Sequence, residues 1–76
     1  MSRANLDPGD EAAVLVRSLI VIDAAAGGSA TVRELMIDLR ANGFPAVLLS
    51  DIWKLYLRTA TVTVTPGTRG TAVGRA

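Results

Sequence analysis

The tetrapeptide Thr31-Val32-Arg33-Glu34 constrains the fold of this chain more than any other local feature. Threonine and glutamate at this spacing form a capping box, in which each side chain accepts a hydrogen bond from the backbone N–H of the other residue at the start of a helix. Gly27-Gly28-Ser29 interrupts the chain just before it. A helix is therefore expected to begin near residue 32, and the residues before the glycines are expected to form a separate element.

A first helix is predicted over residues 8–25. Asp7 is a good N-cap, Pro8 suits the first helical position, and acidic side chains follow in the first turn, where the helix dipole favours them. A buried strand is the alternative because the segment is rich in β-branched residues, but the cap upstream favours the helix. Residues 1–7 are then an N-terminal tail, and residues 8–76 form a single domain.

This first helix carries apolar residues on more than one face. The stripe that we expect to face the core consists of Leu15, Leu19 and Ile22. A second stripe consists of Val14, Val21 and Ala25. Because a chain of 76 residues has one small core, the second stripe is covered either by the C-terminal part of the chain or by another subunit. We favour the subunit and predict a homodimer with Val14, Val21 and Ala25 at its interface.

A second helix is predicted over residues 32–42, ending before Gly43, which can adopt the left-handed conformation that follows a helix. Its core-facing residues are Leu35, Met36 and Leu39. A third helix is predicted over residues 46–57, with a start at Ser50 as the alternative. Its core-facing residues, at spacings of three and four, are Leu48, Leu49, Ile52, Leu55 and Tyr56. The opposite side of this helix carries Val47, Asp51, Lys54 and Arg58.

Residues 59–75 predict a β-hairpin. Ala60, Val62 and Val64 alternate with threonines, which is the period of a half-buried strand, and residues 66–70 form a turn. We expect Val64 to pair with Ala72 and Val62 with Gly74, so that small apolar residues share the inner face. The predicted fold class is mainly α with a C-terminal β-hairpin.

Composition excludes several functional classes. The chain contains no cysteine and no histidine, so it has neither a disulfide framework, nor a Cys/His zinc site, nor a Ser-His-Asp triad. Its carboxylates lack a recognisable metal-ligand spacing, and no glycine-rich phosphate loop is present. We therefore expect no catalytic residues, no metal, no cofactor and no enzyme activity. The longest apolar stretch, residues 14–22, is too short for a membrane span, and we expect a cytoplasmic protein.

Charge is distributed unevenly along the chain. Residues 1–28 carry a net charge of −2 and residues 29–76 a net charge of +3, which together give the overall +1. After Ile52 the charged residues are all basic, namely Lys54, Arg58, Arg69 and Arg75. Such a segment is typical of a surface that meets an anionic partner.

The order of helix, capped helix, helix and hairpin resembles a winged helix-turn-helix domain of bacterial or phage type. The resemblance extends from Pro8 to the C-terminus and is carried by the Thr31 capping box, Gly43-Phe44-Pro45, Ile52-Trp53-Lys54-Leu55 and the hairpin. It implies that the third helix enters the DNA major groove and that the hairpin, the wing, contacts the backbone or minor groove. Lys54 and Arg58 would then lie on the recognition helix, and Arg69 at the tip of the wing.

Two functional hypotheses follow. The first is a small DNA-binding transcriptional regulator or nucleoid-type protein that contacts duplex DNA through the third helix and the wing. Its expected DNA-binding residues are Arg33, Arg40, Lys54, Arg58, Arg69 and Arg75. The second is a winged-helix module that binds another protein through apolar surfaces and does not bind nucleic acid. Charge asymmetry and the wing favour the first hypothesis, whereas the small net charge favours the second. Trp53 is expected to be a core residue.

Overall fold

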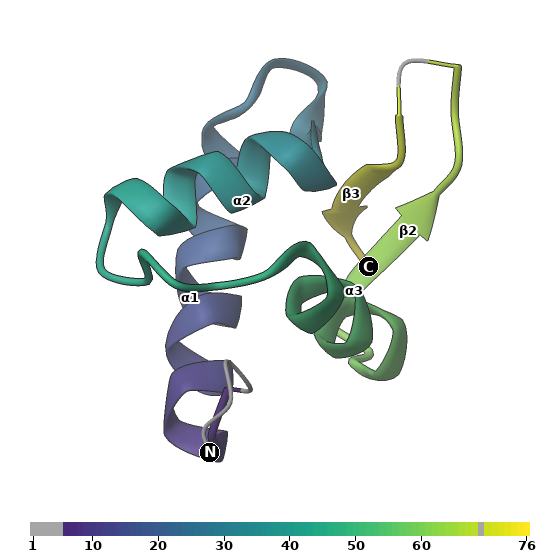
Figure 1. Ribbon diagram of the computed structural model, residues 1–76. Helices are drawn as coiled ribbons and strands as arrows, with labels where there is room; N and C mark the ends of the chain where they lie inside the picture. Colours follow the sequence, from purple (N-terminus) through teal and green to yellow (C-terminus); the bar gives the residue numbers. More distant parts are fainter. Residues whose placement is uncertain (1–5, 69) are drawn as a thin grey trace.

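The computed structural model describes residues 6–68 and 70–76, which fold around one core (Figure 1). In chain order the elements are α1 (Pro8–Ala24), η1 (Ala26–Gly28), β1 (Ser29–Thr31), α2 (Val32–Ala41), α3 (Leu49–Arg58), β2 (Val62–Thr65) and β3 (Ala72–Arg75). Three helices and a C-terminal hairpin occur in the predicted order. The strand β1, which joins the hairpin in a three-stranded antiparallel sheet, was not predicted and makes the fold α+β.

Local side-chain caps begin the first two helices. The Asp7 carboxylate accepts a hydrogen bond of 2.8 Å from the backbone N–H of Asp10 at the start of α1. At the start of α2 the Thr31 hydroxyl accepts from the Glu34 N–H at 3.1 Å, and the Glu34 carboxylate accepts from the Thr31 N–H at 2.8 Å. Gly43 follows α2 with φ of 111°. The capping box and the helix stop are therefore confirmed.

The start of α3 differs from the prediction. The helix begins at Leu49 rather than residue 46, close to the alternative start at Ser50. In the preceding loop Val47 is buried, although it was expected on the outer side of the helix. Leu48 and Leu49 were expected in the core, but they are 44% and 36% exposed. The reason is that residues 45–48 are not helical, so the helical periodicity does not apply to them, and Val47 reaches the core from the loop.

The sheet has the order β1-β3-β2, with β3 in the centre. Val64 pairs with Val73 and Val62 with Arg75, so the predicted register is wrong by one residue. A shift of one residue exchanges the two faces of a strand. The observed register buries Val73, whose exposed fraction is 0%, with Val62, whereas the predicted register would have turned Val73 outward.

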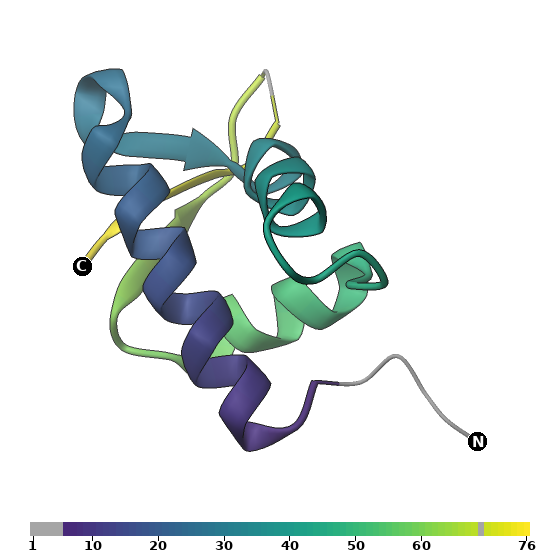
Figure 2. The same ribbon diagram turned by 90° about the vertical axis from the view of Figure 1, so that its left-hand side faces the viewer.

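The buried stripe of α1 is also rotated relative to the prediction. Its centre consists of Val14, Ser18 and Ile22, all at most 1% exposed, while Leu15 and Leu19 are only partly buried at its margin. Val14 is therefore a core residue of the chain itself, which corrects its predicted position at a dimer interface. Figure 2 shows α1 in front of the sheet and of α3, with α2 beside it.

Candidate nucleic-acid interface

The outward side of α3 carries exposed polar and basic side chains. Ser50, Lys54 and Arg58 are exposed, and Trp53 is half-buried between them. Asp51, the one acidic residue in the sequence of α3, is only 7% exposed. Its carboxylate accepts a hydrogen bond of 3.3 Å from the Leu48 N–H and so caps its own helix. The Asp51 carboxylate therefore does not lie on the outward surface, where it would repel phosphate.

A hollow of about 240 Å³ lies where the start of α2, the start of α3 and the hairpin meet. It is lined by Thr31, Val32, Arg33, Leu49, Trp53, Gly70 and Thr71. The Val32 N–H donates a hydrogen bond of 3.0 Å to the Thr71 carbonyl, which holds the start of α2 against the strand that leads into β3. Arg33, in the first turn of α2, thereby lies beside both α3 and the hairpin.

Trp53 is the residue of this hollow that sequence reasoning missed. It was expected in the core, and its half-buried side chain does pack against the core, but it also forms part of the lining of the hollow. The signal that points to it is its four-residue spacing from Leu49 and Leu57, which are 36% and 67% exposed. These three residues follow one side of α3, and the correct start of the helix is needed to recognise that this side is outward.

Two of the predicted DNA-binding arginines form ion pairs within the chain. Arg58, at the end of α3, pairs with Glu11 of α1. Arg75, at the end of β3, pairs with Asp23 at 2.5 Å, and its hydrogen bonds lower the pKa of the Asp23 carboxyl below its ordinary value. Both basic residues thus have an acidic partner from the N-terminal part of the chain.

The other predicted DNA-binding residues have different surroundings. The Arg40 side chain donates a hydrogen bond of 3.0 Å from Nε to the Val47 carbonyl and so braces the loop between α2 and α3. Arg33 and Lys54 are exposed, and no ion pair involves them among residues 6–68 and 70–76. Arg69 lies outside the described residues.

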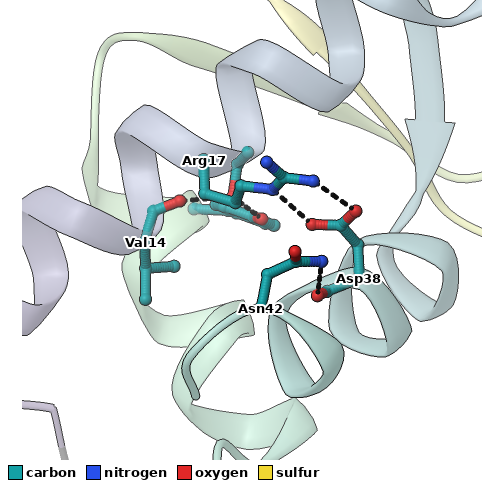
Figure 3. Close-up of polar contacts among 6 residues, drawn as sticks. Val14, Arg17, Asp38 and Asn42 are labelled. Carbon is teal, nitrogen blue, oxygen red and sulfur yellow. Dashed lines mark hydrogen bonds and ion pairs between the residues drawn. The ribbon is translucent and has the colours of Figure 1, made fainter.

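A bidentate ion pair connects α1 to α2. The Arg17 guanidinium donates hydrogen bonds of 2.7 Å and 3.0 Å to the two carboxylate oxygens of Asp38, and Figure 3 shows the two side chains facing each other between the helices. These hydrogen bonds lower the pKa of Asp38 below its ordinary value. The Asn42 amide donates to the Asp38 carbonyl at 2.8 Å and extends the polar contact toward the end of α2. Arg17 is therefore held in a structural contact.

The residues predicted for a dimer interface divide into two groups. Val14 is fully buried in the core, as described above. Val21 and Ala25 are half-buried and line a surface groove between α1 and α2. The large apolar residues of α1 that are exposed are instead Val16 and Ile20.

Neither a metal site nor a membrane span is found in the part of the chain that the structure describes. No three acidic side chains come together there in a way that could hold a metal ion. None of the described helices combines the length and the apolar character that crossing a membrane requires. In comparisons with protein-family models, curated proteins and solved structures, the chain has no significant match.

Proposed function

We propose that the chain is a winged helix-turn-helix domain that binds duplex DNA as a small cytoplasmic regulator or nucleoid-type protein. In this proposal α3 enters the major groove and the β2–β3 hairpin is the wing. The arrangement of α2, the loop, α3 and an adjoining hairpin supports it. The proposal assigns the chain no catalytic role and no cofactor.

The observation that carries the proposal is the position of Asp51. Because this carboxylate is turned into the start of α3, the outward side of the helix presents Ser50, Trp53 and Lys54 without an exposed acidic group of its own. Arg33 lies next to this side across the hollow. Lysine and arginine side chains that displace counterions from phosphate account for most non-specific affinity for DNA.

A salt titration of binding to random-sequence duplex DNA tests this proposal. We expect Lys54→Ala and Arg33→Ala each to weaken binding to all sequences and to reduce the slope of log affinity against log salt by about one unit. Arg58→Ala is the matched control, one turn from Lys54 on the same helix. It should reduce the slope less, because Glu11 already neutralises Arg58.

The proposal fails if the wild-type chain shows no salt-dependent binding to any duplex at low ionic strength. It also fails if Arg58→Ala and Lys54→Ala have equal effects and neither changes the salt slope. Intrinsic fluorescence of Trp53, the only tryptophan in the chain, gives a second readout of binding beside the hollow.

A second candidate function is binding of another protein through α3. Leu48, Leu49 and Leu57 are all at least 36% exposed near Trp53, which is a larger apolar surface than a helix that contacts only phosphate requires. Binding through these residues would depend weakly on salt and would be lost in Leu57→Ala. The salt titration therefore separates the two functions.

A further inference from the structure

The outward side of α3 presents a row of side chains that extends over two helical turns. The row consists of Ser50, Trp53, Lys54 and Leu57, at positions i, i+3, i+4 and i+7 of one helix face. A helix that lies in the major groove can turn residues at this spacing toward the base edges. Leu57 is 67% exposed, more than any other large apolar side chain that the structure describes.

Few of these side chains can read a base through hydrogen bonds. Adenine is read by the paired donor and acceptor of asparagine or glutamine, and α3 contains neither residue. Guanine is read by arginine or lysine, and the one arginine of α3, Arg58, is paired with Glu11. Asp51, which could accept from cytosine, is turned into the start of the helix. The hydrogen-bonding side chains that remain on the outward side are Ser50 and Lys54.

Trp53 and Leu57 are suited to a different feature of the base pairs. Leucine has no hydrogen-bonding atom, and tryptophan has only its indole N–H. Among the groups that base pairs present in the major groove, the thymine 5-methyl group is the one that apolar side chains contact. Against a G·C pair, an apolar side chain would cover amino and carbonyl groups without offering them a partner, which is costly. The chemistry of these two residues therefore favours thymine.

The spacing of the two apolar side chains is close to a repeat of duplex DNA. Trp53 and Leu57 are four residues apart, which is about 6 Å along the helix axis. Two base-pair steps span about 6.8 Å. When α3 lies along the groove, the two side chains can therefore face methyl groups that are two steps apart. A duplex of alternating A and T has a thymine at every second position of each strand and so offers this spacing in every register.

The charges around these apolar side chains favour nucleic acid as the occupant. Lys54 is exposed one turn before Leu57, and Arg33 lies across the hollow from Trp53. Neither basic residue has an ion pair among residues 6–68 and 70–76. The apolar surface thus lies between two positive charges, with the Asp51 carboxylate turned away from it. A polyanion that carries apolar groups complements this arrangement better than an uncharged apolar surface does.

We infer that α3 selects duplex DNA in which thymine methyl groups face Leu57 and Trp53, with Leu57 as the main specificity-determining residue. The inference rests on the proposed binding of duplex DNA. Lys54 and Arg33 supply affinity for phosphate that does not depend on sequence, whereas Leu57 discriminates between bases. The target is therefore rich in A·T pairs.

Replacement of thymidine by deoxyuridine tests the inference, because it removes only the 5-methyl group from each A·T pair. Binding is compared for alternating A·T and alternating A·U duplexes of equal length. The wild-type chain should bind the A·T duplex about fourfold more tightly, which is the effect of burying one methyl group. The slope of log affinity against log salt should be the same on both duplexes, because the phosphate contacts do not change.

Two exposed positions provide the variant and its matched control. Leu57→Ala should lower the preference for A·T over A·U to less than about twofold, because alanine covers less of the methyl group. Its salt slope should equal that of the wild type, and its helical circular dichroism signal should be unchanged. Ile20→Ala is the control, since Ile20 is a residue of similar size that is 53% exposed on α1. This control should keep the full preference.

The possible outcomes separate the inference from the proposed function. Equal affinity of the wild type for the two duplexes, with salt-dependent binding intact, overturns the inference and leaves the proposed function standing. Equal preferences in Leu57→Ala and the wild type also overturn it, because Leu57 would then not discriminate. Absence of binding to any duplex at low ionic strength, as expected of a chain whose α3 binds only protein, overturns the proposed function and the inference together.

Discussion

At the scale of single residues, a polar contact is buried between α1 and α3. The Ser18 hydroxyl, fully buried, donates to the Val14 carbonyl at 2.7 Å and lies 2.5 Å from the Tyr56 hydroxyl. A serine hydroxyl has one proton, which is already donated to Val14, so Tyr56 is the donor in the second bond. Burying a polar group without such partners is costly. This explains how a serine occupies the centre of the buried stripe.

We expect Tyr56→Phe to lower the free energy of unfolding by about 1 kcal/mol, because it removes one buried hydrogen bond. Burial raises the pKa of Tyr56 above its ordinary value. The stability of the wild type should therefore be fully present below the ordinary tyrosine pKa of about 10. It should fall as the pH rises through the raised pKa.

Urea unfolding at neutral and alkaline pH measures both effects. Tyr56→Phe should lack the part of the alkaline decline that belongs to this phenol. Tyr56 is the only tyrosine in the chain, so phenolate absorbance of the wild type reports its ionisation alone. An equal alkaline decline in the variant would contradict the assignment.

At the scale of elements, local interactions fix both ends of α2, and a hydrogen bond attaches its start to the strand entering β3. The capping box satisfies backbone N–H groups at its start, and Gly43 allows the chain to turn away at its end. The hydrogen bond from Val32 to Thr71 attaches its first residue to the strand entering β3. Because Thr31 also pairs with Ala72 in the sheet, one residue positions Arg33 beside the hairpin.

Thr31→Ala should lower the free energy of unfolding by about 1 kcal/mol, since it removes the side-chain acceptor at the start of α2. Thermal or urea unfolding followed by circular dichroism measures the change. Thr68→Ala is the control, because Thr68 is exposed in the turn of the hairpin. The interpretation of the capping box fails if the two alanine variants lose the same stability.

At the scale of the whole molecule, folding cancels much of the charge asymmetry that is present along the sequence. Acidic residues of the N-terminal part, Glu11 and Asp23, pair with Arg58 and Arg75 of the C-terminal part. The two ends of each pair are 47 and 52 residues apart in the chain. The basic surface left for an anionic partner is therefore smaller than the run of basic residues after Ile52 indicates.

Glu11→Gln should strengthen binding to duplex DNA, because it frees Arg58 to contact phosphate. The slope of log affinity against log salt should become steeper by about one unit. Asp10→Asn is the control, since it changes the net charge equally at an exposed position of the same helical turn. We expect little change of slope in this control. Identical slopes in wild type and Glu11→Gln would show that Arg58 does not reach phosphate.

The boundaries of α1 and α2 could be predicted from the sequence because they depend on local interactions. Asp7 and Thr31 each bond to a backbone group three residues away, and Gly43 acts through its own dihedral angle. The alternation of residues 62–65 likewise identifies a strand without reference to its partners. Of the candidate site, this reasoning could predict that Lys54 lies on the outer side of α3.

Only the tertiary structure decided the remaining features, because each depends on residues far apart in the chain. Three residues, Ser29–Thr31, are too short to show a strand pattern, and β1 exists because it pairs with β3. The observed hairpin register buries Val73, and the observed rotation of α1 brings Ser18 into contact with Tyr56. Which basic side chains remain without an acidic partner also depends on contacts between residues that are distant in the sequence. An arginine that looks unpaired along the sequence gains a carboxylate when packing brings a distant helix beside it.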